Sequence, residues 1–329
     1  MTFLEWIPEY QAEAVWIAPW RDDFWGSLYV TMTGMFIVLS CGWVGAYLIL
    51  RRLALVGDAI SHSVLPGLVI ALLIAGKVTS SAMFLGALVA GVATTALIEF
   101  LHGASRTKPD AAIGVSFTFL FALGVILVNW FAGSVDLDAD CVLHGELIHV
   151  AMEVFDPDSV VLAFGVEWPM TLVRMAGVSL VTISLILLFY KELLVSSFDA
   201  GLAASLGFRP RWIHYGLMIG LSLVIVSAFE SVGAILVIAM LILPGATAYL
   251  WVNRLPWMLT LTTLFSPVIA FSGYHLGVWL NCSIAAAMAL AAAGLFLVTW
   301  IIEPRNGLIR QGWVWMKSYR SFMAVPDTN

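Results

Sequence analysis

The stretch RRLALVGDAISHSVLPG, residues 51–67, places two ionisable side chains at the start of an apolar run. Asp58 and His62 are four residues apart, and on a helix this spacing brings both side chains to one face. They follow Arg52 by six and ten residues, which corresponds to roughly 9–15 Å of helix from a membrane edge. An aspartate within a membrane costs about 2.5–3.5 kcal/mol, so such residues face a bundle interior or an aqueous cavity.

The composition indicates an integral membrane protein. Of 329 residues, 61% are hydrophobic and only 11% are charged, and the mean hydropathy is +0.98. Soluble domains carry roughly 25% charged residues. The net charge of −6 is spread along the chain and does not indicate nucleic acid, and the three cysteines form no CxxC pair. We therefore expect an all-α, polytopic helical bundle with one membrane domain over residues 27–302.

Hydrophobic runs predict the membrane spans, because a spanning helix needs about 20 apolar residues. The second and eighth runs are short and the break at Glu230 is ambiguous, so eight or nine spans are expected. The runs cover residues 27–50, 60–76, 81–101, 111–132, 170–190, 212–229, 231–250, 257–272 and 276–302.

The distribution of positive charges predicts that the N-terminus is outside and the C-terminus inside. With that orientation twelve Lys and Arg residues fall inside and three outside, a strong positive-inside bias. The connection 133–169 is then outside and the segment 191–211 is cytoplasmic. Residues 1–26 are expected to form an aromatic segment at the extracytoplasmic face of the membrane. Residues 303–329 are expected to form a basic cytoplasmic tail. The inside residues are Arg51, Arg52, Arg106, Lys108, Lys191, Arg209, Arg211, Arg254, Arg305, Arg310, Lys317 and Arg320, and the outside ones Arg21, Lys77 and Arg174.

Asp58 and His62 are candidate metal ligands. A carboxylate oxygen and an imidazole nitrogen suit a divalent ion such as manganese, iron or zinc. The alternative is that Asp58 pairs with Arg51 or Arg52, or caps a helix, while His62 bonds a backbone carbonyl. Two ligands also do not complete a site, so a second copy of the chain or another span would have to supply the others.

A second candidate group lies in DLDADCVLHGELIHV, residues 136–150. Asp140, His144, Glu146 and His149 could form an outer metal funnel, although acidic loops are commonly only solvated. The sequence HGELIH is not the metalloprotease motif HExxH, because its histidines are five residues apart and glutamate does not follow the first. Glu230, at the outer end of a span, is a further candidate pathway residue that solvation alone would also explain.

Two absences and one cytoplasmic segment bear on energy coupling. The sequence contains no GxxxxGK[ST] motif, so this chain does not hydrolyse ATP through a P-loop. It also contains no GxSxG nucleophile motif, and nothing indicates an enzyme. SSFDAGLAASLGFRPRW, residues 196–212, predicts a short loop helix rich in small residues between two spans.

Four motifs resemble the permease subunits of bacterial ABC-type manganese, zinc or iron importers. They are RRLALVGDAISHSVLPG, DLDADCVLHGE, FDAGLAASLG and ESVGAILVIAMLILPGATA, and they follow in order through most of residues 27–302. The first and last are specific, and the other two are supporting. The resemblance implies that Asp58 and His62 are pathway or gate residues and that Glu230 occupies a position of less settled role. It also implies that the segment around Asp199, Ala203 and Gly207 docks into an ATPase.

The resemblance further implies a homodimeric or paired permease in the bacterial plasma (inner) membrane, in contact with lipid. Two cytoplasmic ATP-binding subunits and an extracytoplasmic metal-binding protein would be its partners. The transported manganese, zinc or iron would be cargo, and no permanently bound cofactor is expected. The alternatives are a secondary transporter driven by an ion gradient and an ABC permease for a metal chelate.

Overall fold

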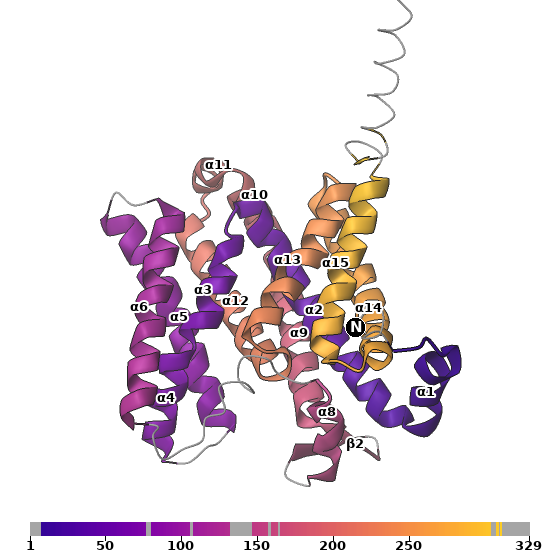
Figure 1. Ribbon diagram of the computed structural model, residues 1–329. Coiled ribbons are helices and arrows are strands. Elements are labelled where there is room, and N and C mark those ends of the chain that lie inside the picture. The colour runs from indigo at the N-terminus through magenta and orange to yellow at the C-terminus, as the bar shows by residue number, and fades with distance from the viewer. Residues whose placement is uncertain are drawn as a thin grey trace, which may run out of the picture.

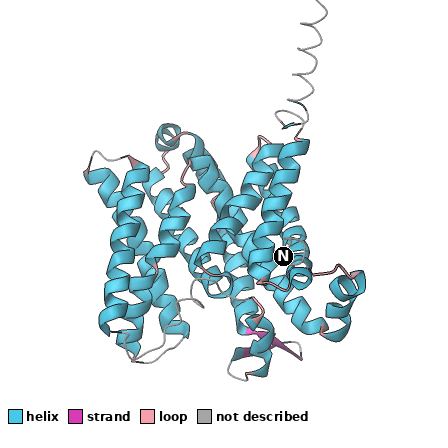
Figure 2. Cartoon of the chain, in the orientation of Figure 1, coloured by secondary structure: helices cyan, strands magenta, loops and turns pink. Residues whose placement is uncertain are grey.

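A computed structural model describes residues 8–76, 80–105, 108–131, 147–156, 159–163, 165–303, 307, 308 and 310. These residues form a bundle of helices and one two-stranded hairpin (Figure 2). The first part contains η2 (Glu13–Ile17), α1 (Ala18–Asp22), α2 (Phe24–Arg51), α3 (Ala54–Ser63), α4 (Leu65–Ala75), α5 (Ser80–Ala104) and α6 (Pro109–Phe131). The middle contains α8 (His149–Met152), η3 (Glu153–Phe155), β1 (Val160–Ala163) and β2 (Val166–Pro169). The remainder contains α9 (Met170–Leu188), α10 (Tyr190–Phe198), α11 (Ala200–Ser205), α12 (Pro210–Val232), α13 (Ala234–Trp251), α14 (Leu255–Leu280) and α15 (Ile284–Ile302).

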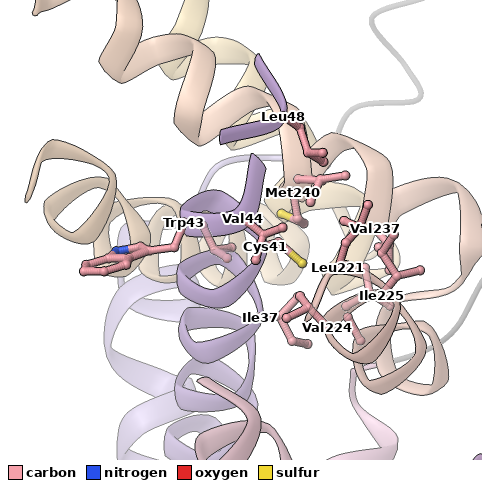
Figure 3. Close-up of a cluster of buried hydrophobic side chains, with 14 of the residues drawn as sticks. Ile37, Cys41, Trp43, Val44, Leu48, Leu221, Val224, Ile225, Val237 and Met240 are labelled. Atoms are coloured by element: carbon pink, nitrogen blue, oxygen red, sulfur yellow. The ribbon is translucent and has the colours of Figure 1, made fainter. Parts of the chain in front are cut away.

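Helix α2 is the central element of the bundle. It packs on α9, α13 and α14, and its residues Ile37, Cys41, Val44 and Leu48 belong to the buried cluster shown with side chains from α12 and α13 in Figure 3. Gly45 makes the contact with α13 close, because a Cβ atom there would lie 1.7 Å from the carbonyl oxygen of Leu241. Small residues allow membrane helices to approach at this distance, where van der Waals packing replaces the hydrophobic effect.

Helices α4, α5 and α6 form one side of the bundle, and α14 and α15 form the other (Figure 1). The α4–α5 contact rests on a reciprocal pair of glycines: a Cβ at Gly67 would lie 2.2 Å from the Gly86 carbonyl oxygen, and a Cβ at Gly86 2.4 Å from that of Gly67. The Ser63 and Thr94 hydroxyls are 2.5 Å apart and link α3 to α5. Helix α3 contacts α5, α6, α12 and α13, so it joins the side helices to the centre.

A proline separates α3 from α4. Pro66 has no N–H and therefore cannot donate to the carbonyl of His62, the bond that would join the two helices into one regular span. The chain turns at Val64, which keeps helical dihedral angles (φ −67°, ψ −29°). The break is therefore a local kink at a proline.

The two ends of the bundle differ. The hairpin and α8 lie at the end opposite α11 (Figure 1), and Val160 pairs with Pro169 in the antiparallel register of the hairpin. Glu153 is close to α9: its carboxylate accepts from the Thr171 backbone N–H at 3.0 Å, at the first turn of that helix. A carboxylate at a helix N-terminus satisfies one of the free donors there, so this contact orients the start of α9.

The described residues confirm the predicted helical membrane protein. They contain eight helices long and apolar enough to cross a membrane, together with the shorter apolar stretch Leu236–Trp251 of α13. Each predicted run overlaps one of these segments, the second run spanning α3 and α4.

Three predicted boundaries were wrong. The last two spans are separated at residues 281–283 and not at 273–275, because the buried His275 bonds to Val15 and Trp20 inside the bundle and α14 continues past it. Helix α12 continues past Glu230 to Val232, and the break falls at Gly233, whose φ of +81° favours glycine. The second span begins at Ala54 rather than residue 60, and it therefore includes both Asp58 and His62.

The aromatic N-terminal segment makes a specific contact with α14. The Trp16 ring stacks on His275 at a centroid distance of 4.3 Å, and Trp20 Nε1 donates to His275 Nε2 at 3.2 Å. Residues 12–22 are therefore packed against the bundle.

Candidate metal-pathway site

Asp58 and His62 lie together on α3, as their spacing predicts. His62 Nε2 is 3.3 Å from Asp58 Oδ1, and the two side chains are 30% and 39% exposed respectively. Asp58 is in the interior of α3, whose N-cap is Leu53, so it does not cap the helix. The carboxylate therefore has the imidazole as a partner and remains half accessible for a ligand.

The surroundings of the pair are apolar on one side and tightly packed on another. The His62 ring lies 6.1 Å from the Phe117 ring and 6.3 Å from the Phe121 ring, both on α6. Gly57 is buried next to Asp58, and a Cβ there would meet the Leu241 side chain of α13 at 2.3 Å. The glycine lets α3 approach α13, while the phenylalanines shield one face of the imidazole.

The local chemistry offers two side-chain ligands and one backbone oxygen. A carboxylate oxygen and a neutral imidazole nitrogen are ligands that divalent transition metals accept. Because Pro66 cannot donate to it, the His62 carbonyl lacks its regular helical partner, and unwound backbone carbonyls can coordinate cations inside membranes. Among the described residues, no three His, Cys, Asp or Glu side chains are close enough to hold a metal ion. Within the described part of the chain, one copy of the pair is therefore an incomplete site.

Of the other predicted metal residues, only His149 can be placed with its side chain. Asp140, His144 and Glu146 lie outside the described residues, as does the side chain of Glu230, whose backbone is in the last turn of α12. His149 is on α8 and exposed, so it is the one member of the predicted outer funnel that can be placed.

The predicted docking segment forms α11. Asp199 is its N-cap: Oδ1 accepts from the backbone N–H groups of Gly201 at 2.8 Å and Leu202 at 2.9 Å. Ala203 is fully buried against the bundle. Gly207 ends the segment with φ +87°, a conformation that L side chains rarely adopt.

An exposed apolar edge runs along this segment. Phe198, Leu202 and Leu206 are spaced by four residues and are 65%, 50% and 59% exposed. Figure 1 shows α11 at the extremity of the bundle, next to α10. Large exposed apolar side chains at the end of α10, on α11 and directly after it are typical of a surface that a partner covers.

A half-buried polar network near α11 was not predicted. Arg51, at the end of α2, contacts Ser196 and Ser197 of α10 and His214 of α12, and His214 contacts Glu99 of α5. Sequence reasoning counted Arg51 as one of the inside charges and gave the other members no role. Their separations of 115 to 163 residues left no local pattern to recognise.

A cavity of about 320 Å³ lies between α2, α9 and α12. Its lining includes Val44, Ile186 and Leu217, and no lining residue is ionisable. It therefore offers no ligand to a metal ion, and the Asp58–His62 pair remains the candidate site.

Comparison with known proteins gives consistent matches over most of the chain. Residues 27–303 match the family described as the ABC 3 transport family. The manganese transport system membrane protein MntD of Bacillus subtilis (strain 168) is 41% identical over 282 residues, which is 85% of this chain and 93% of that protein. The zinc transport system membrane protein TroD of Treponema pallidum (strain Nichols) is 40% identical over 285 residues, 87% of this chain and 76% of that protein. The solved structure of PsaBC from Streptococcus pneumoniae in complex with Fab aligns with a TM-score of 0.72 and 32% identity, covering 90% of this chain and 98% of that one.

Proposed function

The chain belongs to the ABC 3 transport family, and from that premise we propose that it is the membrane permease subunit of an ATP-binding-cassette importer for a divalent transition metal ion. The observation that carries this is the identity of 40% or more, over most of both chains, to proteins named as manganese and zinc transport system membrane proteins. The eight long apolar helices agree with a multi-pass permease. The predicted ABC metal permease is thereby confirmed at the level of the family.

In this proposal Asp58 and His62 are transient ligands on the metal pathway. Their 3.3 Å separation and half-exposed state allow an ion to replace the contact between them and then to leave. Passage requires binding that is favourable enough for entry and weak enough for release. An incomplete site fits that requirement, with the remaining ligands coming from water, the His62 carbonyl or the second permease subunit.

The nature of the ligands does not select one metal. A carboxylate and an imidazole serve manganese, iron and zinc, and selectivity then depends on geometry and metal supply. We propose that the extracytoplasmic metal-binding protein takes part in that choice. Bare ions are favoured over a metal chelate, because the pair offers direct ligands.

The chain would act as a transport subunit whose energy comes from partner ATPases. The sequence has no P-loop, and the segment from the end of α10 through α11 exposes the apolar edge of Phe198, Leu202 and Leu206 at one end of the bundle. We propose that an ATP-binding subunit covers this edge on the cytoplasmic side, and that the hairpin end faces outward. This orientation, with the N-terminus outside and the C-terminus inside, follows from the positive-inside bias.

Uptake into liposomes tests the function. The permease, its ATP-binding subunit and the delivery protein are reconstituted, and labelled manganese, zinc and iron are offered with and without ATP. We expect ATP-dependent accumulation of at least one of these ions. Uptake that needs no ATP and follows a proton or sodium gradient would instead identify a secondary transporter, and uptake restricted to a chelated metal would identify a chelate permease.

Replacement of Leu202 tests the docking surface. Leu202→Ser should weaken association with the ATP-binding subunit by about 30-fold, the loss expected when an interface residue worth about 2 kcal/mol is truncated. Leu202→Met, which conserves volume and apolarity, should retain association. The measurement is the affinity of the purified permease for its ATP-binding subunit. Equal affinities of the two variants would place the docking surface elsewhere.

A further inference from the structure

The side chain of Arg51 is held by three directed contacts. Its Nε donates to Ser197 Oγ at 2.9 Å and its Nη2 donates to Ser196 Oγ at 2.8 Å. Both serine hydroxyls donate their own protons to the Leu193 carbonyl, at 2.6 and 3.3 Å, so their lone pairs are available to Arg51. The planar guanidinium thus binds the last turn of α10 through two hydrogen bonds, directly before Asp199, the N-cap of α11.

The third contact of Arg51 is with His214, which in turn contacts Glu99. Arg51 Nη1 lies 3.4 Å from His214 Nδ1, and His214 Nε2 lies 2.7 Å from Glu99 Oε1. A guanidinium can only donate and a carboxylate can only accept. These contacts fit an imidazole that donates from Nε2 to Glu99 and accepts from Arg51 at Nδ1, an assignment made from the hydrogen-bond partners. One connected set of contacts thus joins five residues, Ser196, Ser197, Arg51, His214 and Glu99.

The chain of contacts connects four helices at the α11 end of the bundle. It runs from α10 through the end of α2 to α12 and α5, and its side chains are half-buried. Arg51 is also the last residue of α2, and only Arg52 and Leu53 separate it from α3. Asp58 lies seven residues beyond Arg51 along this connection. A displacement of α10 would therefore move the connection between α2 and α3, and α3 carries Asp58 and His62.

We propose that Arg51, His214 and Glu99 are positioning residues that couple the ATPase-docking segment to α3, α5 and α12; this inference rests on the proposed function. ATP-driven movement of α11 pulls α10, and the Arg51 fork transmits the movement to the α2–α3 junction. The His214–Glu99 contact carries it to α5, which packs on α3 through Ser63 and Thr94. The relay acts through the position of Asp58 and His62, and none of its members is a metal ligand.

A metal site at the same place is a poorer explanation. A cavity of about 170 Å³ is lined by Glu99, His102 and His214, residues that often bind metal. A metal on His214 Nε2 would displace the proton that Glu99 accepts, and the guanidinium on the other ring nitrogen would repel the cation. Neither Asp58 nor His62 lines this cavity.

The number of metal ions imported per ATP hydrolysed tests the relay in the reconstituted complex. Arg51→Lys keeps the positive charge but replaces a three-way fork with a single ammonium group. We expect the Arg51→Lys permease to bind the ATP-binding subunit as wild type does and the assembled complex to hydrolyse ATP, while the ions imported per ATP fall about tenfold, a common size for coupling between sites. Arg52→Lys, the same change at the neighbouring exposed arginine, should keep the wild-type ratio.

The serines provide an independent pair of variants. Ser196→Ala with Ser197→Ala removes both serine acceptors of Arg51 and should lower the number of ions imported per ATP. Ser196→Thr with Ser197→Thr keeps both hydroxyls and should keep the wild-type number. If the number of ions imported per ATP is unchanged in Arg51→Lys or in the double alanine variant, the relay is overturned. If Arg51→Lys does not assemble with its ATP-binding subunit, the serine variants alone decide. If the wild-type complex shows no ATP-dependent uptake, the proposed function itself fails, and that outcome is separate from a loss confined to the variants.

Discussion

The Asp58→Asn permease should import metal at least about 100-fold more slowly than wild type while it still assembles with its ATP-binding subunit. Replacing a residue that only hydrogen-bonds to a metal ligand typically costs 10–100-fold in metal affinity or activity. Asp58 is proposed to contact the ion itself, so a larger loss is expected. Asparagine matches aspartate in size but has no charge, so only a neutral amide oxygen is left to bind the cation. ATP-dependent uptake in liposomes is the measurement, with assembly checked by co-purification.

Two further variants sharpen this test. Asp110→Asn removes an exposed carboxylate at the start of α6, far in sequence from the pair, and should leave uptake unchanged. His62→Gln removes the imidazole and should also lower uptake, because Asp58 then loses its neighbouring ligand. Normal uptake by a well-folded Asp58→Asn complex would remove Asp58 from the pathway.

The Gly45→Ala permease should lose most of its folded protein. The added Cβ would lie 1.7 Å from the backbone carbonyl oxygen of Leu241, and no side-chain rotation can relieve a clash with backbone. Overpacking commonly costs 1–3 kcal/mol, and we expect about 3 kcal/mol or more here because α2 and α13 must separate. The thermal unfolding midpoint of the purified protein in detergent should fall, together with the yield of monodisperse protein.

Gly114→Ala is the matched control for that change. A Cβ at Gly114 would meet no atom within 4 Å, and alanine is a better helix former than glycine by about 0.8–1.0 kcal/mol. This variant should therefore unfold at the wild-type temperature or above it. A Gly45→Ala protein as stable as Gly114→Ala would show that α2 and α13 do not pack as described.

The sequence was most informative where a feature depends on neighbouring residues. Apolar runs of span length located the helices, and the four-residue spacing of Asp58 and His62 placed the two side chains within 3.3 Å. The break predicted at residues 273–275 was wrong because a polar residue in an apolar run can either end a span or form its hydrogen bonds inside the span, as His275 does. Its partners, Val15 and Trp20, are more than 250 residues away, and only the folded chain shows them.

Features built from distant residues could not be predicted. Nothing near Gly45 indicates that its missing side chain admits the Leu241 carbonyl of another helix. The sequence placed Arg51 among the inside charges and offered Asp58 as a possible partner, yet its partners in the fold lie 145 to 163 residues along the chain. A single sequence records composition and spacing, whereas such contacts depend on which helices become neighbours.

The kink at Pro66 also has a mechanical consequence. Bending a regular helix requires its backbone hydrogen bonds to stretch, and each bond contributes about 1 kcal/mol. Between α3 and α4 the bond from residue 66 to the carbonyl of His62 is absent from the outset. The α3 half, which carries Asp58, can therefore tilt against the α4 half, which Gly67 fixes to α5, without stretching that bond. The missing N–H group of Pro66 thus lowers the resistance of this span to bending, and what holds α3 in place is its packing on α5, α6, α12 and α13.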